Sequence, residues 1–145
     1  MSDKRQSWDQ YFMDLAEKVS ERATCDRLHV GCVLVKDKQL ISSGYNGSLS
    51  GQPHCDEVGH LLVGDDPSCV RVNHAERNAI CQAAKLGIAT DGAIAYCNWF
   101  PCFECLKTLI AAGIKKIYYK DVYRPDRKSK YPEEILNIIP LEQLK

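Results

Sequence analysis

The hydrophobic residues near the start of the chain recur with the period of a helix. They are spaced by four, three and four residues, at Trp8, Phe12, Leu15 and Val19. Residues at these intervals lie on one face of a helix. The pattern therefore predicts an amphipathic helix that ends near Ala23.

The stretches that follow predict strands, a long loop and further helices. Residues 30–45 read as two strands, rich in Val, Leu and Ile, around a Lys-Asp-Lys turn. No period is visible from Asn46 to Asn73, although loops in compact domains rarely exceed about 12–15 residues. The remaining predicted elements are two helices closed by glycines (74–87 and 102–113), two strands (92–99 and 114–123) and a last helix that begins near Pro132.

The order of these elements indicates the fold class. A strand, a helix and another strand in succession imply parallel pairing, because the helix crosses over one face of the sheet. The sequence therefore predicts an α/β domain of three layers with a mixed sheet. The 145 residues suit one domain, and we treat 1–145 as a single unit.

Charge narrows the classes of function. Lys and Arg total 19 and Asp and Glu total 19, so the formal net charge is zero. A protein that binds a nucleic-acid backbone usually carries a basic excess, because its affinity comes from neutralising phosphates. The balance argues against a nucleic-acid partner. It leaves open a small anionic ligand, for which two or three cations suffice.

The start of the chain and its cysteines indicate a reducing compartment. The first residues are polar, and no apolar run approaches the length of a membrane span. We therefore expect a cytoplasmic protein with no membrane partner. In such a compartment, eight cysteines interleaved with histidines are more typical of metal binding than of disulfides.

Two short motifs have the residue types of a zinc site. The motifs HAE (74–76) and PCFEC (101–105) each fall at the predicted start of a helix, which favours the thiolates that zinc requires. Two thiolates and one imidazole are three ligands, and a catalytic zinc keeps its fourth position for a water whose pKa it lowers. Glu76 is placed to move protons beside that water. The predicted ligands are His74, Cys102 and Cys105.

The combination of these motifs resembles a known family. H-x-E followed by P-C-x-x-C is the signature of zinc-dependent nucleobase deaminases. Residues 7–48, together with 74–80 and 101–105, resemble the deoxycytidylate (dCMP) deaminase family over almost the whole chain. Further markers of that family are the GYNG turn at 44–47 and the spacing from Cys25 to Val30-Gly31.

The resemblance implies a fold, a reaction and a set of ligands. The fold is that of cytidine deaminase, a mixed five-stranded sheet flanked by helices, in homo-oligomers that are often hexamers. The reaction is hydrolytic deamination of dCMP to dUMP and ammonia with a catalytic Zn²⁺, which feeds thymidylate synthesis. Members are commonly activated by dCTP and inhibited by dTTP, and Mg²⁺ can accompany either effector. The effector is expected near Gly44, Tyr45, Asn46 and Gly47.

The resemblance also assigns substrate contacts. Asn46 would hydrogen-bond the sugar hydroxyl, Arg27 and Tyr123 would hold the 5′-phosphate, and Ala75 would contact the substrate. Three of these have ordinary alternatives. Asn46 would then be a residue that tolerates positive φ, Tyr123 an exposed aromatic and Arg27 a solvated charge.

Two local features bear on substrate specificity. Family members generally carry Thr or Ser a few residues before Pro-Cys, where this chain has Asn98, which can still donate and accept hydrogen bonds. Residues 123–132 (YRPDRKSKYP) are rich in Arg and Lys, and we expect most of these charges to be solvated. If several point into the site, dCTP becomes a second candidate substrate, because a triphosphate needs more positive partners.

The long loop carries a second set of candidate zinc ligands. Cys55, His60 and Cys69 have suitable side chains, and Cys25 offers a fourth. Four protein ligands describe a structural zinc, which would order a loop that buries little apolar surface. The resemblance supports Cys25 and Cys55, since some dCMP deaminases bind a second zinc at the matching positions. His54 is an alternative to His60, and a loop of merely polar or small residues is the alternative to a zinc site.

Four other functions fit parts of the sequence. The motifs alone allow a purely structural zinc, with Glu76 as an ordinary carboxylate at a helix start. A deaminase of bases in tRNA or single-stranded DNA is disfavoured by the neutral charge and the GYNG turn. A zinc-stabilised nucleotide sensor would not need Glu76. A thiol oxidoreductase would use Cys102 and Cys105 but leave His74 without a role.

Overall fold

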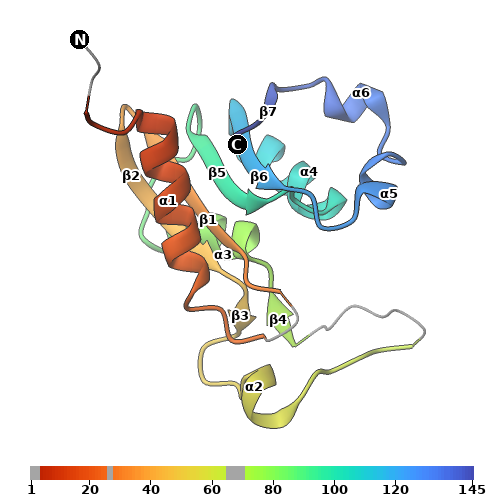
Figure 1. Ribbon diagram of the computed structural model, residues 1–145. Coiled ribbons are helices and arrows are strands. Elements are labelled where there is room, and N and C mark those ends of the chain that lie inside the picture. Colours follow the sequence, from red (N-terminus) through yellow and green to blue (C-terminus); the bar gives the residue numbers. More distant parts are fainter. Residues whose placement is uncertain (1–3, 26–27, 65–70) are drawn as a thin grey trace.

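The computed structural model describes residues 4–25, 28–64 and 71–145, and Figure 1 shows the arrangement of its elements. The helices are α1 (Trp8–Ser20), α2 (Cys55–Val58), α3 (Ala75–Lys85), α4 (Phe103–Ala111), α5 (Pro125–Lys128) and α6 (Glu133–Leu136). The strands are β1 (Gly31–Lys36), β2 (Gln39–Tyr45), β3 (Gly47–Ser48), β4 (Val72–Asn73), β5 (Ile94–Trp99), β6 (Lys116–Asp121) and β7 (Leu141–Gln143).

The main sheet is mixed and has five strands, which confirms the predicted fold class. Its order is β2-β1-β5-β6-β7. Strand β1 is antiparallel to both β2 and β5, whereas β5, β6 and β7 are parallel to one another. The predicted strand–helix–strand unit is thus the parallel pair β5–β6 with α4 as its crossover.

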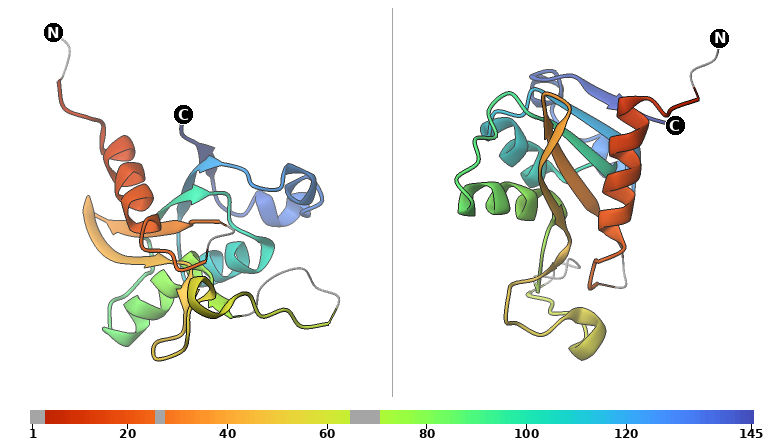
Figure 2. Two further views of the ribbon diagram at one scale, coloured as in Figure 1. Left: turned by 60° about the horizontal axis from the view of Figure 1, so that its bottom comes forward. Right: turned by 90° about the vertical axis from the view of Figure 1, so that its left-hand side faces the viewer.

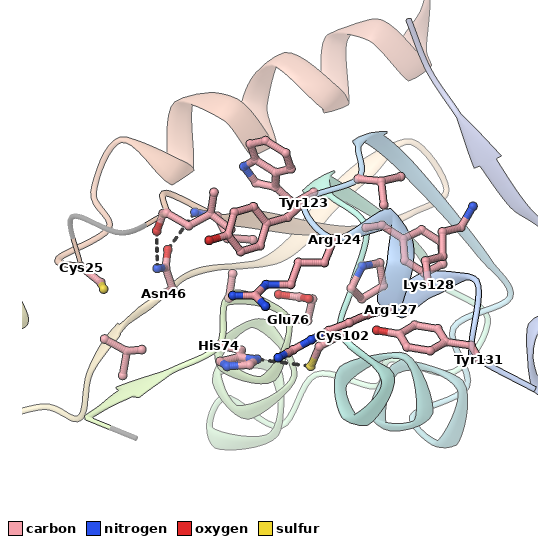
Figure 3. A pocket seen from close by; sticks show the side chains of 18 residues that line it. Cys25, Asn46, His74, Glu76, Cys102, Tyr123, Arg124, Arg127, Lys128 and Tyr131 are labelled. Carbon is pink, nitrogen blue, oxygen red and sulfur yellow. Dashed lines mark hydrogen bonds between the residues drawn. The ribbon is translucent and has the colours of Figure 1, made fainter. Parts of the chain in front are cut away.

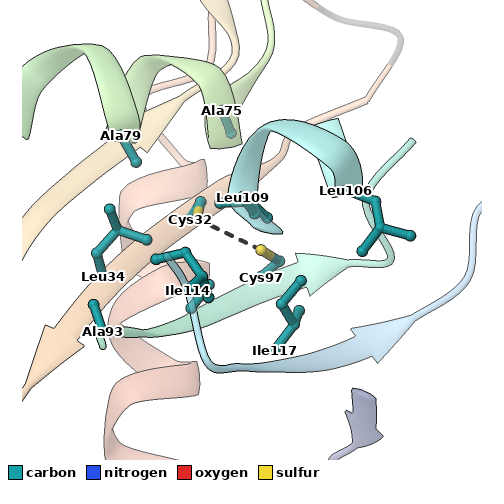
Figure 4. Packing of buried hydrophobic residues seen from close by; sticks show 11 residues of the cluster. Cys32, Leu34, Ala75, Ala79, Ala93, Cys97, Leu106, Leu109, Ile114 and Ile117 are labelled. Atoms are coloured by element: carbon teal, nitrogen blue, oxygen red, sulfur yellow. Dashed lines mark hydrogen bonds between the residues drawn. The ribbon is translucent and has the colours of Figure 1, made fainter. Parts of the chain in front are cut away.

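Helices cover both faces of the sheet, as Figure 2 shows. Alternate residues of β1 point to opposite layers, because successive side chains of a strand alternate between faces. Cys32 and Leu34 pack with α3 and α4, in the cluster drawn in Figure 4. Val33 and Val35 pack with α1. Burial on both faces explains why residues 31–35 of this strand carry no charge.

Two glycines allow the helices to lie close against the sheet. A Cβ at Gly31 would be 2.0 Å from the carbonyl oxygen of Ala16 in α1. A Cβ at Gly44 would be 2.3 Å from the carbonyl oxygen of Ala75 in α3. Gly44 therefore fixes the distance between β2 and the start of α3, where the HAE motif lies.

The sequence-based element boundaries need three corrections. The first helix ends at Ser20 rather than near Ala23. The long loop contains the single turn α2 and is closed at its base by pairing of β3 with β4. The helix predicted from Pro132 is only the turn α6, and the chain then forms β7, which the pattern did not locate. None of the helices in the described residues is long and apolar enough to span a membrane.

Candidate metal centre and nucleotide pocket

The two sequence motifs meet at one edge of the sheet. His74 is the residue immediately before α3, and Cys102 is the residue immediately before α4. Strands β5 and β6 both end at this edge, where the amide of Phe100 donates to the carbonyl of Asp121. In parallel sheets, side chains that follow the carboxyl ends of neighbouring strands converge on a common crevice.

His74, Cys102 and Cys105 form a cluster that could hold a metal ion, with ligand atoms within 4.8 Å of one another. The Nδ1 atom of His74 lies 3.4 Å from the sulfur of Cys102 and 3.3 Å from the sulfur of Cys105. Nitrogen and sulfur ligands of a tetrahedral zinc lie about 3.5 Å apart. The donor set and its spacing therefore fit zinc, and the sequence-based grouping of these three residues agrees with the geometry.

The electrostatics of the cluster favour a thiolate beside a protonated partner. The hydrogen bond from the Cys105 thiol, followed by that from His74, lowers the pKa of Cys102 to about 4. The hydrogen bond with Cys102 in turn raises the pKa of His74. A thiolate is the form of cysteine that binds zinc, so the lowered pKa of Cys102 favours metal binding.

Glu76 is the buried carboxyl group next to the cluster. Its side chain is 4% exposed, and burial raises its pKa to about 7. A carboxyl group with a pKa near the working pH can both accept and release a proton. The position two residues beyond His74 leaves Glu76 outside the set of three ligands.

A pocket of about 240 Å³ opens above Glu76 and the cluster, as Figure 3 shows. The substrate contacts implied by the resemblance are found here in three cases, Asn46, Ala75 and Tyr123. The fourth, Arg27, lies outside the described residues. The other lining side chains include the aromatic residues Trp99, Phe100 and Tyr131 and the cations Arg124, Arg127 and Lys128.

Asn46 and Tyr123 occupy different parts of the pocket wall. Asn46 is 7% exposed; its amide oxygen accepts from the Val30 amide at 2.8 Å and its amide nitrogen donates to the Leu28 carbonyl at 2.7 Å. Asn46 is not at positive φ, so that alternative is wrong. Tyr123 is 48% exposed and packs edge-on against Trp99, with ring centroids 6.0 Å apart.

Comparison with known proteins assigns the chain to a family. Residues 6–121 match the family described as the cytidine and deoxycytidylate deaminase zinc-binding region. The chain belongs to this family. It is 47% identical to ComE operon protein 2 of Bacillus subtilis over 83% of the chain and 63% of that protein. It is 36% identical to the deoxycytidylate deaminase of Schizosaccharomyces pombe over 84% of the chain, although it spans only 39% of that longer enzyme.

A solved structure extends the similarity to the fold. The dCMP deaminase of cyanophage S-TIM5, determined in complex with dCMP and dUMP, superposes with a TM-score of 0.80 at 28% identity. The match covers 98% of this chain and all of that one. The family resemblance and the cytidine-deaminase fold are thereby confirmed, including the five-stranded mixed sheet.

The chain also has a second His/Cys cluster. Cys25, Cys55 and His60 have ligand atoms within 4.8 Å of one another, and the sulfur of Cys25 lies 3.6 Å from Nδ1 of His60. His54 is not in the cluster, which favours His60 between the two histidines considered. Cys69, the fourth predicted ligand, lies outside the described residues. Figure 1 shows α2, which begins at Cys55, on a loop that projects from the body of the fold.

The structure refines the prediction for the basic segment after β6. Arg127 and Lys130 are exposed, as expected of solvated charges, whereas Arg124 and Lys128 are half-buried. Three of the four basic residues line the pocket. The available signal was topological, because the segment directly follows the carboxyl end of a parallel strand. Arg124, Arg127 and Lys128 are therefore site residues that the sequence reasoning undervalued.

Asn98 does not line the pocket. Its amide oxygen accepts from the Gly31 amide at 2.8 Å, and its amide nitrogen donates to the His29 carbonyl at 3.1 Å. Asn98 and Asn46 thus satisfy the backbone between residues 28 and 31 from opposite sides. Asn98 therefore supports the backbone that carries the pocket-lining residues Leu28 and Val30.

Proposed function

We propose that this protein is a zinc-dependent deaminase that converts dCMP to dUMP and ammonia. The observation that carries the proposal is the buried carboxyl group of Glu76 beside the His74–Cys102–Cys105 cluster, at the floor of a pocket whose rim is cationic. The similarity to deoxycytidylate deaminases and to a structure with bound dCMP and dUMP supports this substrate.

The proposed reaction needs a metal and a proton carrier. His74, Cys102 and Cys105 would hold the zinc, which supplies Lewis-acid activation of water. Glu76 takes a proton from the attacking water and delivers it to the ring nitrogen next to the amino-bearing carbon. It then takes the proton of the hydroxyl group that has been added to this carbon and delivers it to the departing amine, so that the C–N bond breaks as the C=O bond forms. In the metal-free protein, burial raises the pKa of Glu76 to about 7, and a carboxyl group in this range can serve as base and acid in turn.

The substrate would be held by the walls of the pocket. Asn46 has one remaining amide hydrogen and a free lone pair with which to contact the sugar hydroxyl, since Val30 and Leu28 use the others. Ala75 borders the base, and Tyr123 at the exposed rim is placed for the 5′-phosphate. Arg27 remains our prediction for a second phosphate contact.

We also propose that Cys25, Cys55 and His60 bind a structural zinc, with Cys69 as the fourth ligand. The spacing of the three described ligands supports this assignment. A metal here would hold together the segment that follows α1, the turn α2 and the loop that follows α2. The expected metal content is two zinc ions per chain.

Regulation and assembly rest on the family resemblance. We propose activation by dCTP and inhibition by dTTP, each with or without Mg²⁺, near residues 44–47, and a homohexameric enzyme. The packing limits how an effector could approach, because α3 fills the space beside Gly44 and Asn46 is buried. Residues 44–47 form the end of β2 and the start of β3 rather than a turn, and Tyr45 has the half-buried side chain among them.

One observation favours a second candidate substrate, dCTP. Arg124, Arg127 and Lys128 line one pocket, and a triphosphate needs more cationic partners than a monophosphate does. An enzyme that acts on both dCMP and dCTP would explain a third cation.

The experiment is an assay panel of dCMP, dCTP, deoxycytidine and an RNA hairpin, with and without added dCTP or dTTP. Zinc per chain is counted on the same sample. We expect dUMP and ammonia from dCMP and no reaction with RNA. If the protein does not deaminate dCMP, the proposal is contradicted and the zinc-stabilised nucleotide sensor becomes the favoured function. Thiol–disulfide exchange by metal-free protein without deamination would favour the oxidoreductase.

A further inference from the structure

The first turn of α3 is held in place without a side-chain cap. His74 occupies the N-cap position of this helix, but its side chain does not cap it. The Nδ1 atom of His74 instead lies 3.4 Å from the sulfur of Cys102 and 3.3 Å from that of Cys105. An N-cap side chain ordinarily accepts a hydrogen bond from a backbone amide of the first turn and so fixes the helix start. The position of His74 therefore depends on other contacts of this turn.

The side-chain amide of Asn78, in the first turn of α3, supplies such contacts. Its nitrogen donates to the carbonyl of Tyr45 at 2.8 Å and to the carbonyl of Asn73 at 3.2 Å. Its oxygen accepts from the side-chain amide nitrogen of Asn73 at 2.7 Å. The reverse orientation would turn the oxygen of Asn78 toward two carbonyl oxygens, so the partners fix the orientation of this amide.

The two carbonyl groups that accept from Asn78 each precede a residue of the site. The carbonyl of Asn73 belongs to the peptide group that leads into His74, a member of the metal cluster. The carbonyl of Tyr45 belongs to the peptide group that leads into Asn46, which lines the pocket. A peptide group is planar and nearly rigid, so a restraint on its carbonyl also restrains the Cα of the next residue. One amide nitrogen therefore connects the metal cluster to the wall of the pocket.

The pairing of β3 with β4 adds to this connection. Gly47 lies opposite Asn73 in that pair, so the backbone on both sides of Asn46 is attached to the segment that carries His74. Asn78 itself is half-buried and does not line the pocket. It can act on a bound nucleotide only through the residues that it holds.

We propose that Asn78 is a positioning residue that sets the distance between His74 and Asn46, and with it the alignment of the substrate's reacting carbon at the metal centre. This inference rests on the proposed function, in which Asn46 contacts the sugar and His74 holds zinc. A misplacement of about 1 Å in such a site can lower the rate by about 100-fold. Removal of Asn78 should therefore slow turnover more than it weakens binding.

The test uses Asn78→Ala, with Ser42→Ala as a matched control. The Ser42 hydroxyl donates to the Ala79 carbonyl at 2.7 Å, so the control loses a different buried hydrogen bond between the same strand, β2, and the same helix, α3. The kcat for dCMP per zinc-loaded site should fall by about 10- to 100-fold in Asn78→Ala and by less than about twofold in Ser42→Ala. The KM for dCMP, and the affinity for dUMP measured by calorimetry, should change by less than about threefold in both variants.

Amide hydrogen exchange tests the same connection without turnover. In Asn78→Ala, exchange should become faster in residues 44–48 and in residues 72–78 together, because one side chain restrains both segments. Ser42→Ala should leave the exchange of residues 72–74 unchanged. Asn73→Ala is a second variant, which keeps Asn78 but removes the donor that orients its amide. It should show the same pattern with a fall in kcat of about fivefold, and it decides the question if Asn78→Ala does not fold.

Three results would overturn the inference. A wild-type kcat in Asn78→Ala, or in Asn73→Ala where the first variant does not fold, would mean that Asn78 does not position the site. Equal falls in kcat and in melting temperature for Asn78→Ala and Ser42→Ala would mean that Asn78 only stabilises the fold. Unchanged exchange in both segments would mean that it does not connect them. A wild-type protein without dCMP turnover would instead refute the proposed function, while the exchange measurement still decides whether Asn78 holds His74 and Asn46 together.

Discussion

The two His/Cys clusters have the same described donors, two thiols and one imidazole, but different surroundings. His74, Cys102 and Cys105 lie where two helix starts meet the end of the central sheet, beside a buried carboxyl group and a pocket. The second cluster joins the segment that follows α1 to a projecting loop, and His60 is exposed. The same donors thus occur in two different surroundings, so ligand type alone would not distinguish a catalytic from a structural zinc.

The two clusters differ in the groups and the cavity that lie next to the metal ligands. A catalytic zinc needs an open position, a proton carrier and a cavity, and the first cluster has Glu76 and the pocket. A structural zinc needs a closed shell and contributes folding energy. The loop of the second cluster has little buried surface to order it. Several of its aliphatic side chains are exposed, namely Leu49, Val58, Leu61, Leu62 and Val63.

The largest effects should come from removing one ligand of each cluster. Cys105→Ser is expected to lose the zinc of the first cluster and all measurable deamination, because the group that activates water is gone. Cys55→Ser should instead lose only the second zinc and keep much of the activity. Metal analysis and dCMP turnover on both variants check this. Loss of all activity at an unchanged zinc count in Cys55→Ser would contradict the division of roles.

Stability of the metal-free protein should depend on pH through Glu76. Burial raises the pKa of Glu76 from 4.5 to about 7, so the unfolded chain ionises first as pH rises. The contribution of Glu76 to the free energy of unfolding is therefore fully present below about pH 4.5. It falls by about 3 kcal/mol as the pH rises to about 7. Glu76→Gln should lack this loss.

Denaturation of reduced, chelator-treated wild type and Glu76→Gln at pH 5 and pH 8 measures the difference. The free energy of unfolding of the variant, relative to that of the wild type, should be about 2 to 3 kcal/mol higher at pH 8 than at pH 5. The difference reports Glu76 together with its electrostatic interactions with Cys102 and His74. An advantage that is the same at both pH values would show that Glu76 is not buried as described.

A smaller loss of stability should follow from replacing Gly44, which lies against the start of α3. In Gly44→Ala, the new Cβ would be 2.3 Å from the Ala75 carbonyl oxygen, so α3 must move. We expect a loss of about 1–3 kcal/mol and weaker dCMP turnover. Gly47→Ala serves as the control, since its Cβ would meet only side chains, that of Tyr45 at 3.2 Å and the hydroxyl of Thr24 at 3.4 Å. Equal losses in the two variants, from thermal denaturation, would contradict this view of α3.

Much of the fold and the first cluster could be predicted because their signals are local. Strand β1 is apolar on both faces, and HAE and PCFEC sit at helix starts that glycines and periodicity delimit. The three residues of β7 are too few to show a period, so their pairing with β6 depends on the tertiary structure.

The outer part of the site could not be predicted for a related reason. Arg124 and Arg127 look like solvated charges in the sequence, and only the position of α5 at the end of β6 brings them to the pocket. The choice of His60 over His54 likewise depends on the path of the loop. Both outcomes are set by contacts between segments that are distant in the chain.

The most direct test of the central claim is dCMP turnover by Glu76→Gln with its zinc counted. The glutamine side chain has the size of the glutamate but cannot take up and release a proton. Both clusters should therefore keep their zinc while proton transfer is lost. We predict that the wild type forms dUMP and ammonia in equal amounts. The variant should retain the same zinc content and be slower by about 10²- to 10⁴-fold or more. Full activity in the variant, or loss of zinc in proportion to loss of activity, would contradict the account.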